Sequence, residues 1–239
     1  MTRNNLLFVF FFAPFTCFAQ MNDAGLWTSL SLSMPVNKEL EFSVSPEIRL
    51  DENLSQVSTF FGDVGVEYEL MKYLYTNLTY RIGGRNSGEW IDLRQRYSFG
   101  LGLKNTWGDF RAGWLCRMQA SRSGTVAESD ADFSTALRNK FSFKYTGLKK
   151  TDFSTSFETF NAAGAYGTML LTDWRWQAQV ERRIINKRNF VSIGYLIQKD
   201  LMSEQPELDY VFLVGYKLEV GWLKEKQGEE AVPSDVVPQ

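Results

Sequence analysis

Hydrophobic and polar residues alternate along residues 40–50. Leu40, Phe42, Val44, Ile48 and Leu50 fall on one side of the alternation, and charged or small polar residues fall on the other. A period of two residues is typical of a β-strand with one apolar and one polar face. The segment is therefore predicted to be a strand whose two faces meet different environments.

The same alternation recurs along the rest of the chain. No segment has the period of an amphipathic helix, and no second domain or internal repeat is evident. The pattern predicts an all-β protein. Its expected strands are residues 24–34, 40–50, 58–70, 73–85, 91–104, 109–121, 133–146, 151–161, 172–183, 189–199 and 207–222.

Most of these segments are longer than the strands of soluble proteins, which average about 5–6 residues. A tilted strand needs about 9–11 residues to cross a bilayer. The connections also alternate between short turns, as near Asn37, and longer loops, as at 122–132. Short turns at one end and long loops at the other are typical of outer-membrane barrels. We therefore expect an antiparallel up-and-down transmembrane β-barrel.

The number of strands is a separate question. Single-chain bacterial barrels normally have an even number of strands, with both chain ends on the periplasmic side. The alternation gives an odd count, so either one strand is missed or the N-terminal segment returns through the lumen. We expect 10–12 strands and prefer twelve.

The N-terminus has the features of a secretory signal peptide at residues 1–19. Arg3 provides the positive region, residues 6–12 are apolar, and Ala19 fits the small residue before a cleavage site. A lipoprotein site at Cys17 is the rival interpretation. The signal peptide predicts export to the outer membrane of a Gram-negative bacterium.

Cleavage after Ala19 leaves a mature chain with one cysteine, Cys116, and so with no internal disulfide. The polar end of the chain carries two prolines and is predicted to be a disordered periplasmic tail. The expected organisation is a barrel domain at residues 20–222 and a tail at 223–239.

The last expected strand ends in an apolar series at every second position. The series resembles the β-signal by which the barrel assembly machinery recognises its clients, and it consists of Val214, Tyr216, Leu218, Val220 and Trp222. The expected partners are outer-membrane lipids, that machinery during biogenesis, and a possible partner in an outer-membrane complex. Aromatic residues near strand ends fit interfacial girdles: Trp27, Tyr73, Tyr75, Trp90, Trp107, Trp174, Tyr210 and Trp222.

If the apolar face meets lipid, the polar face lines the lumen. We call its main members the lumen charge network: Glu47, Arg49, Glu67, Arg81, Arg94, Arg96, Arg117, Arg138, Glu158, Arg175 and Glu181. The wider inward set adds Asp63, Glu69, Arg85, Asp92, Arg111, Lys140 and Arg183. These charges either fill and rigidify a small barrel or form a constriction that selects a polar or anionic solute. No pair of carboxylates is marked as a general acid and base.

Composition excludes some classes of function. The chain has no histidine, which removes Ser-His-Asp catalysis and histidine-ligated zinc. A net charge of −2 provides no basic field for nucleic acid. Mean hydropathy is −0.26, unlike that of a bundle of transmembrane helices. We expect no metal and no cofactor.

Several short motifs resemble the outer-membrane proteins of Bacteroidota grouped as domain of unknown function 2490. The resemblance covers roughly residues 24 to 221 and implies an outer-membrane β-barrel without an assigned activity. Its motifs are Gly25-x-Trp27, Pro46-Glu47-Ile48-Arg49-Leu50, Leu78-Thr79-Tyr80-Arg81, Leu93-Arg94-Gln95-Arg96-Tyr97, Arg117 with Arg122, Leu137-Arg138-Asn139-Lys140, Phe157-Glu158-Thr159-Phe160-Asn161 and Ile193-Gly194-Tyr195-Leu196.

Three classes of function stay open. The first, which we prefer, is a non-enzymatic barrel, either a narrow channel or a structural subunit of an outer-membrane assembly. The second is an outer-membrane enzyme that modifies lipid or lipopolysaccharide without histidine. The third is a soluble, lipocalin-like barrel with the faces reversed, which would place Leu40, Phe42 and Val44 inside.

Overall fold

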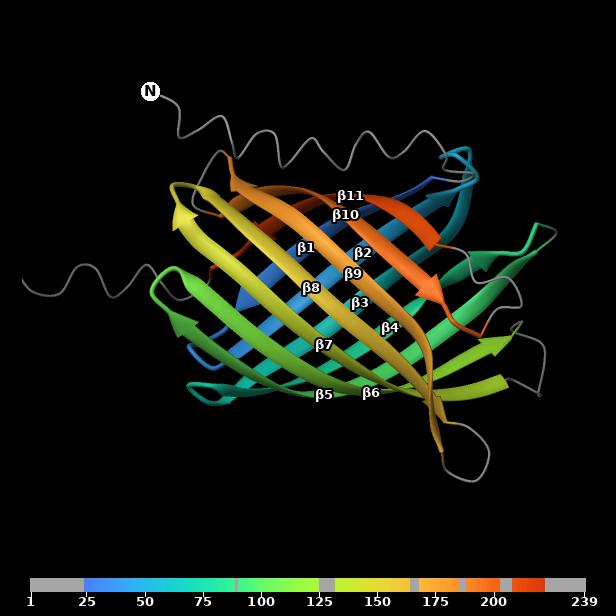
Figure 1. Cartoon of the computed structure of the whole chain (residues 1–239), viewed down its shortest axis with the longest axis horizontal. Coiled ribbons are helices and arrows are strands. Elements are labelled where there is room, and N and C mark those ends of the chain that lie inside the picture. Colours follow the sequence, from blue (N-terminus) through green and yellow to red (C-terminus); the bar gives the residue numbers. More distant parts are fainter. Residues whose placement is uncertain are drawn as a thin grey trace, which may run out of the picture.

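The computed structural model describes residues 24–88, 90–124, 132–163, 168–184, 188–202 and 208–221. Over these residues the chain is all-β and closes into a single barrel (Figure 1). No helix in the described ranges is long and apolar enough to cross a membrane. The predicted signal peptide and the predicted tail lie outside the described residues.

The strands lie within three residues of the positions that the alternation predicts. Strand pairing extends several of them beyond the alternating segments, by up to three residues. The strands are β1 (Gly25–Pro35), β2 (Leu40–Asp51), β3 (Gln56–Met71), β4 (Leu74–Asn86), β5 (Ile91–Trp107), β6 (Phe110–Gly124), β7 (Asp132–Leu148), β8 (Thr151–Ala163), β9 (Met169–Arg183), β10 (Asn189–Asp200) and β11 (Leu208–Glu219).

The barrel closes between β1 and β11, and this pair is parallel. The register runs from Gly25 opposite Val211 to Ser33 opposite Glu219. All other neighbouring strands are antiparallel. In an up-and-down barrel with an odd number of strands, the first and last strands run in the same direction, so the closing pair has to be parallel.

The described barrel therefore has eleven strands, within the expected range of 10–12, and the preference for twelve is corrected. The odd count needs no missed strand, because the parallel pair satisfies both edges of the sheet. It also places the first residue of β1, Gly25, at the same end of the barrel as Val211 and Asp51.

The two ends of the barrel differ in their connections. We call them the short-turn end, where β1–β2, β3–β4, β5–β6, β7–β8 and β9–β10 are joined, and the long-loop end, where the other connections lie. At the first short turn the Asn37 side chain accepts hydrogen bonds from the backbone N–H groups of Glu39 and Leu40. At the third, Gly108 has a φ of 58°, a conformation that glycine adopts without strain.

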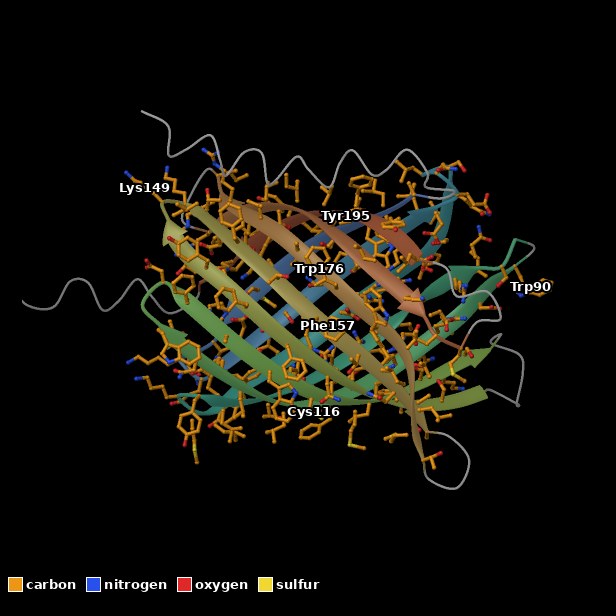
Figure 2. The ribbon with its side chains drawn as sticks, in the orientation of Figure 1. Trp90, Cys116, Lys149, Phe157, Trp176 and Tyr195 are labelled. Atoms are coloured by element: carbon orange, nitrogen blue, oxygen red, sulfur yellow. The ribbon has the colours of Figure 1, made fainter. Side chains whose placement is uncertain are left out.

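The outer surface of the wall is apolar. Every strand exposes at least one large hydrophobic side chain there, and Figure 2 shows carbon-rich side chains projecting from the lower edge. We call these residues the outer apolar belt: Leu30, Phe42, Val44, Ile48, Val64, Leu78, Tyr97, Phe99, Met118, Phe141, Phe157, Trp176, Ile193 and Val214. Soluble monomers rarely expose so continuous an apolar surface.

The buried hydrophobic residues are few by comparison. They are Phe61, Leu115, Phe190, Leu196 and Val211, and Arg138 and Glu158 are buried as well. These residues fill the inside of the barrel. The molecule thus reverses the usual arrangement, in which charged residues are almost never fully buried and large apolar residues form the core.

Two of the aromatic residues that we expected in interfacial girdles lie inside the barrel instead. Trp27 packs beneath the guanidinium of Arg49, and the ring of Tyr75 covers Gly102. Both occupy the inward positions of their strands, and position in the strand, rather than nearness to its end, determines the face. Tyr73, Trp90 and Trp107 lie at strand ends with more than half of their surface exposed, at 56%, 55% and 56%.

The predicted β-signal lies at the closing seam. Val214 is on the outer face, 45% exposed, and the hydroxyl of Tyr216 donates to the side-chain oxygen of Asn189. β11 ends at Glu219, and the N–H of Val220 donates to the carbonyl of Ser33 at 2.8 Å. Trp222 lies outside the described residues.

Close packing of adjacent strands leaves no room for a side chain at Gly83. A methyl group at Gly83 would collide with the carbonyl oxygen of Phe60 and the backbone of Phe61, whereas nothing lies within 4 Å of the same position at Gly62. We predict that Gly83→Ala destabilises the barrel by about 1–3 kcal/mol and that Gly62→Ala does not. Urea unfolding in detergent, followed by heat-modifiable migration, measures both. Equal unfolding midpoints would contradict the packing.

Candidate functional site: an arginine-rich cup in the lumen

A cavity of about 1040 Å³ occupies the lumen at the long-loop end. Residues from every strand line it, and most belong to the halves of the strands nearest the long loops. We call this cavity the arginine cup, because eight arginines line it: Arg49, Arg81, Arg85, Arg94, Arg96, Arg122, Arg138 and Arg175. Three aspartates also line it: Asp51, Asp173 and Asp209.

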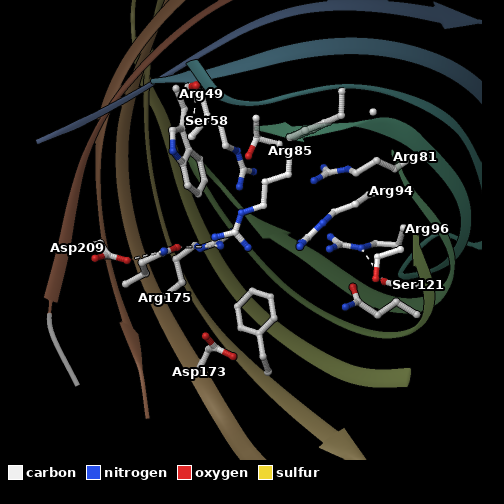
Figure 3. A pocket seen from close by; sticks show the side chains of 18 of the residues that line it. Arg49, Ser58, Arg81, Arg85, Arg94, Arg96, Ser121, Asp173, Arg175 and Asp209 are labelled. Atoms are coloured by element: carbon white, nitrogen blue, oxygen red, sulfur yellow. Dashed lines mark hydrogen bonds between the residues drawn. The ribbon is translucent and has the colours of Figure 1, made fainter. Parts of the chain in front are cut away.

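Strand register brings these arginines together from distant parts of the sequence. Alternate residues of one strand point inward, so Arg94 and Arg96 of β5 share the inner face. Arg96 lies directly opposite Arg81 of β4, and Arg94 lies opposite Gly83. Arg138 of β7 and Arg175 of β9 are the strand neighbours of Phe160 and Glu158 on β8. Figure 3 shows the guanidinium groups converging on the same space.

Two bidentate ion pairs form the floor of the cup. Arg138 donates to both carboxylate oxygens of Glu158, at 3.1 and 2.9 Å, and also to Gln119 at 3.3 Å. Arg81 holds both oxygens of Asp63, at 2.7 and 2.6 Å. The Arg138–Glu158 pair is the more buried, with side chains 11% and 9% exposed. Such geometry is required for a buried pair to offset its desolvation.

Aromatic rings hold several guanidinium groups in place. Arg49 lies 3.5 Å from the ring centre of Trp27 and 4.9 Å from that of Phe61. Arg81 also lies over the Phe61 ring, 3.5 Å from its centre. Arg138 and Arg175 lie 4.5 and 5.1 Å from the ring centre of Phe160. Cation–π contacts of this kind restrain the cation and leave its edge N–H groups available.

The short-turn half of the lumen has a different charge arrangement, because two lysines there each lie close to two carboxylates. Lys104 pairs with Glu69 and lies 3.6 Å from Glu67. Lys144 lies 2.8 Å from Asp152 and 3.2 Å from Glu181. Around these two lysines the positive charge is matched by local carboxylates, whereas in the cup several arginines have no such pair.

The predicted lumen charge network lies on the inner face, but the structure divides it into three groups. Arg49, Arg81, Arg94, Arg96, Arg138 and Arg175 line the cup. Glu47, Glu158 and Arg117 lie at or below its floor, where Glu47 accepts a hydrogen bond from Arg49 at 2.7 Å. Glu67 and Glu181 belong to the short-turn half.

Some residues of the cup were not among the predicted ones. Phe61, Phe160, Asp173 and Asp209 line it, and so does Trp27, which the sequence had suggested as a girdle residue. Phe61 and Asp209 could have been found, because they alternate in phase with inward charges of their own strands. Which arginines they contact depends on the register of the neighbouring strands, and the sequence does not show that register.

Other candidate chemistry is limited within the described ranges. No group of three or more carboxylate, cysteine or histidine side chains there is arranged to hold a metal ion. Cys116 is a free thiol at an outward position between Leu115 and Arg117, two residues of the inner face.

Comparison with known proteins adds the family. Residues 24–207 match the family described as protein of unknown function DUF2490. The chain belongs to this family. The match spans β1 to β10, which are ten of the eleven described strands. No curated protein matches the chain.

The floor of the cup allows a direct test of its energetics. Glu158→Gln leaves the Arg138 guanidinium without its counter-charge, and removing one partner of a buried pair costs about 3–5 kcal/mol. We expect this loss in urea unfolding of Glu158→Gln, and we expect the double variant Arg138→Met/Glu158→Gln to recover much of it. The single variant Arg138→Met completes the comparison. If the losses of the two single variants simply add in the double variant, the pair is not coupled.

Proposed function

We propose that this protein is an outer-membrane β-barrel without enzymatic activity, which serves as a narrow channel for small polar solutes. The observation that carries the proposal is the combination of an apolar outer wall and a charged lumen in one closed sheet. The predicted signal peptide at residues 1–19 supports export to this membrane.

The outer apolar belt fits lipid better than water. Val64, Leu78 and Ile193 are 51%, 58% and 57% exposed, although each lies in the middle of its strand. Removing apolar surface from water is worth about 25 cal/mol per Å², so a continuous belt around the barrel favours insertion strongly. The soluble, lipocalin-like alternative needs these residues inside, where the described barrel has its charges.

The lumen supports a narrow channel rather than a wide pore. The Arg138–Glu158 pair and the side chain of Leu196, which is 1% exposed, fill the middle of the barrel. The carboxylates of Glu158, Asp63 and Glu47 all accept hydrogen bonds from arginines, which makes them poor general acids. This engagement supports a role in selecting solutes over one in catalysis.

The proposed orientation places the short turns in the periplasm and the long loops outside the cell, as in other bacterial barrels. The arginine cup then opens to the exterior. The parallel pairing of β1 with β11 puts Gly25, the first residue of β1, at that same end.

A second candidate is a structural subunit of an outer-membrane assembly. It is favoured by an apolar hollow of about 600 Å³ on the outer wall, where the small side chain of Ala120 lies among Leu78, Phe99 and Leu137. A transmembrane partner with an apolar surface would fit this hollow.

The lipid-facing belt gives the first test. Val44 lies opposite Leu32 and Val64 on its two neighbouring strands, at the middle of the belt. Arginine there should cost about 2–4 kcal/mol in the bilayer. We expect Val44→Arg to abolish heat-modifiable folded barrel in the outer-membrane fraction, while Arg94→Met, on the inner face, leaves its amount unchanged. Normal insertion of Val44→Arg would reject the assignment of faces.

Conductance tests the channel itself. We expect small, well-defined single-channel currents from the wild type in planar bilayers, and several-fold larger currents from Arg138→Ala/Glu158→Ala, because that change opens the middle of the lumen. A variant of equal charge change outside the floor, Lys144→Ala/Glu181→Ala, should have a smaller effect. A silent bilayer with both the wild type and the opened variant would favour the structural-subunit candidate.

A further inference from the structure

The arginine cup contains more positive charge than its own acids neutralise. Arg49, Arg81 and Arg138 have carboxylate partners in Glu47, Asp63 and Glu158. Arg85, Arg94, Arg96 and Arg175, by contrast, form no ion pair with any described residue. Figure 3 shows that these four side chains extend into the same cavity.

Two of these arginines donate hydrogen bonds to neutral side chains. Arg96 donates to the hydroxyl of Ser121 at 3.2 Å, and Arg175 donates to the side-chain oxygen of Gln198 at 3.0 Å. Gln198 in turn donates to Asp209 at 2.8 Å, so the amide of Gln198 lies between Asp209 and Arg175. The buried Nε of Arg175 has no hydrogen-bond acceptor among the described residues.

The acids nearest to these four arginines form no ion pair with them. Asp51, Asp173 and Asp209 line the cup, and Asp92 lies at its rim, where it accepts a hydrogen bond from Ser87 at 2.9 Å. Like charges that share a partly desolvated cavity repel one another unless an anion lies between them. An anion taken up by the cavity would lower this repulsion, so the arrangement favours the binding of negative charge.

The geometry points to the arginine cup as a binding site for a small, soluble organic polyanion that carries two or more phosphate or carboxylate groups. Planar guanidinium groups bind both kinds of anion through two parallel hydrogen bonds. Four of them around one space can engage more than one anionic group at once. The volume of about 1040 Å³ is at the upper end of small-molecule sites.

The position of the cup favours a soluble ligand over a membrane lipid. Its arginines lie on the inner face of a closed wall, and the outer face of the same strands carries the apolar belt. The headgroup of a bilayer lipid would have to enter the lumen while its acyl chains stayed outside. A solute that enters from the long-loop end meets no such obstacle.

Calorimetric titration of the full mature chain in a neutral detergent tests the site. The probes are inorganic tripolyphosphate and citrate, with maltotriose as the uncharged comparison. We expect both anions to bind the wild type and maltotriose not to bind. Absence of binding by both anions at low salt would overturn the inference.

Matched variants locate the site. Arg94→Gln and Arg175→Gln each remove one arginine of the cup and should weaken tripolyphosphate binding by about tenfold, the effect of losing one charge-assisted contact. Arg111→Gln removes the same charge near the short-turn end and should leave the affinity unchanged. Equal weakening by Arg111→Gln would show general attraction to a basic lumen and would overturn the site. Arg94→Lys, which keeps the charge but loses the fork, should fall between wild type and Arg94→Gln, and it serves if the glutamine variants fail to fold.

Two further comparisons separate the alternatives. Adding phosphatidylglycerol to nanodiscs that hold the protein should not displace tripolyphosphate, and displacement would identify a lipid headgroup as the occupant instead. The inference deepens the proposed channel, since the cup would be its entrance, but binding and conductance are measured independently. A barrel that binds polyanions without conducting refutes the channel alone, and one that conducts without binding refutes the cup alone.

Discussion

The hydrogen bonds between β1 and β11 are the constraint on which the rest of this structure depends. In a bilayer no water can satisfy the N–H and C=O groups of an open sheet edge, so a strand protein can span it only as a closed barrel. Eleven up-and-down strands can close only by pairing the first and last in parallel, and this chain does so from Gly25 to Ser33. Closure then divides the side chains of every strand between two environments that never mix.

That division explains why so many charges can be buried here. Each strand alternates, so an apolar wall outside requires a polar lumen inside, and the narrow lumen leaves little water to solvate it. Arg138 and Arg81 meet this requirement through bidentate pairs with Glu158 and Asp63, while aromatic rings such as Phe61 and Phe160 cover the guanidinium faces. Arg85, Arg94, Arg96 and Arg175, nearer the long loops, form no such pair with a described residue. The same wall therefore encloses lysine–carboxylate clusters toward one end and a group of arginines without ion pairs toward the other.

Much of the fold could be predicted from the alternation of residues, because the face of a residue in a strand depends only on its position in the chain. This is why the strands were placed within three residues, and why Val44 was assigned outward and Arg94 inward. The number of strands was a different matter: twelve was preferred on the ground that barrels usually have even counts, although the alternation itself indicated eleven. Trp27 and Tyr75 were assigned to the girdles from their nearness to strand ends, but their inward phase determines their position.

The sequence by itself determined which side chains face outward and which face the lumen, since a period of two residues is a local property of the backbone. Only the tertiary structure decided which inward charges meet. Strand stagger brings Arg138 to Glu158, and Lys144 to Asp152 and Glu181, and it leaves Arg85, Arg94, Arg96 and Arg175 in one cavity without ion pairs to described residues. Those neighbours come from different strands, and their register is set by turns, bulges and the closing seam rather than by the residues themselves. The arginine cup is for that reason a property of the closed barrel.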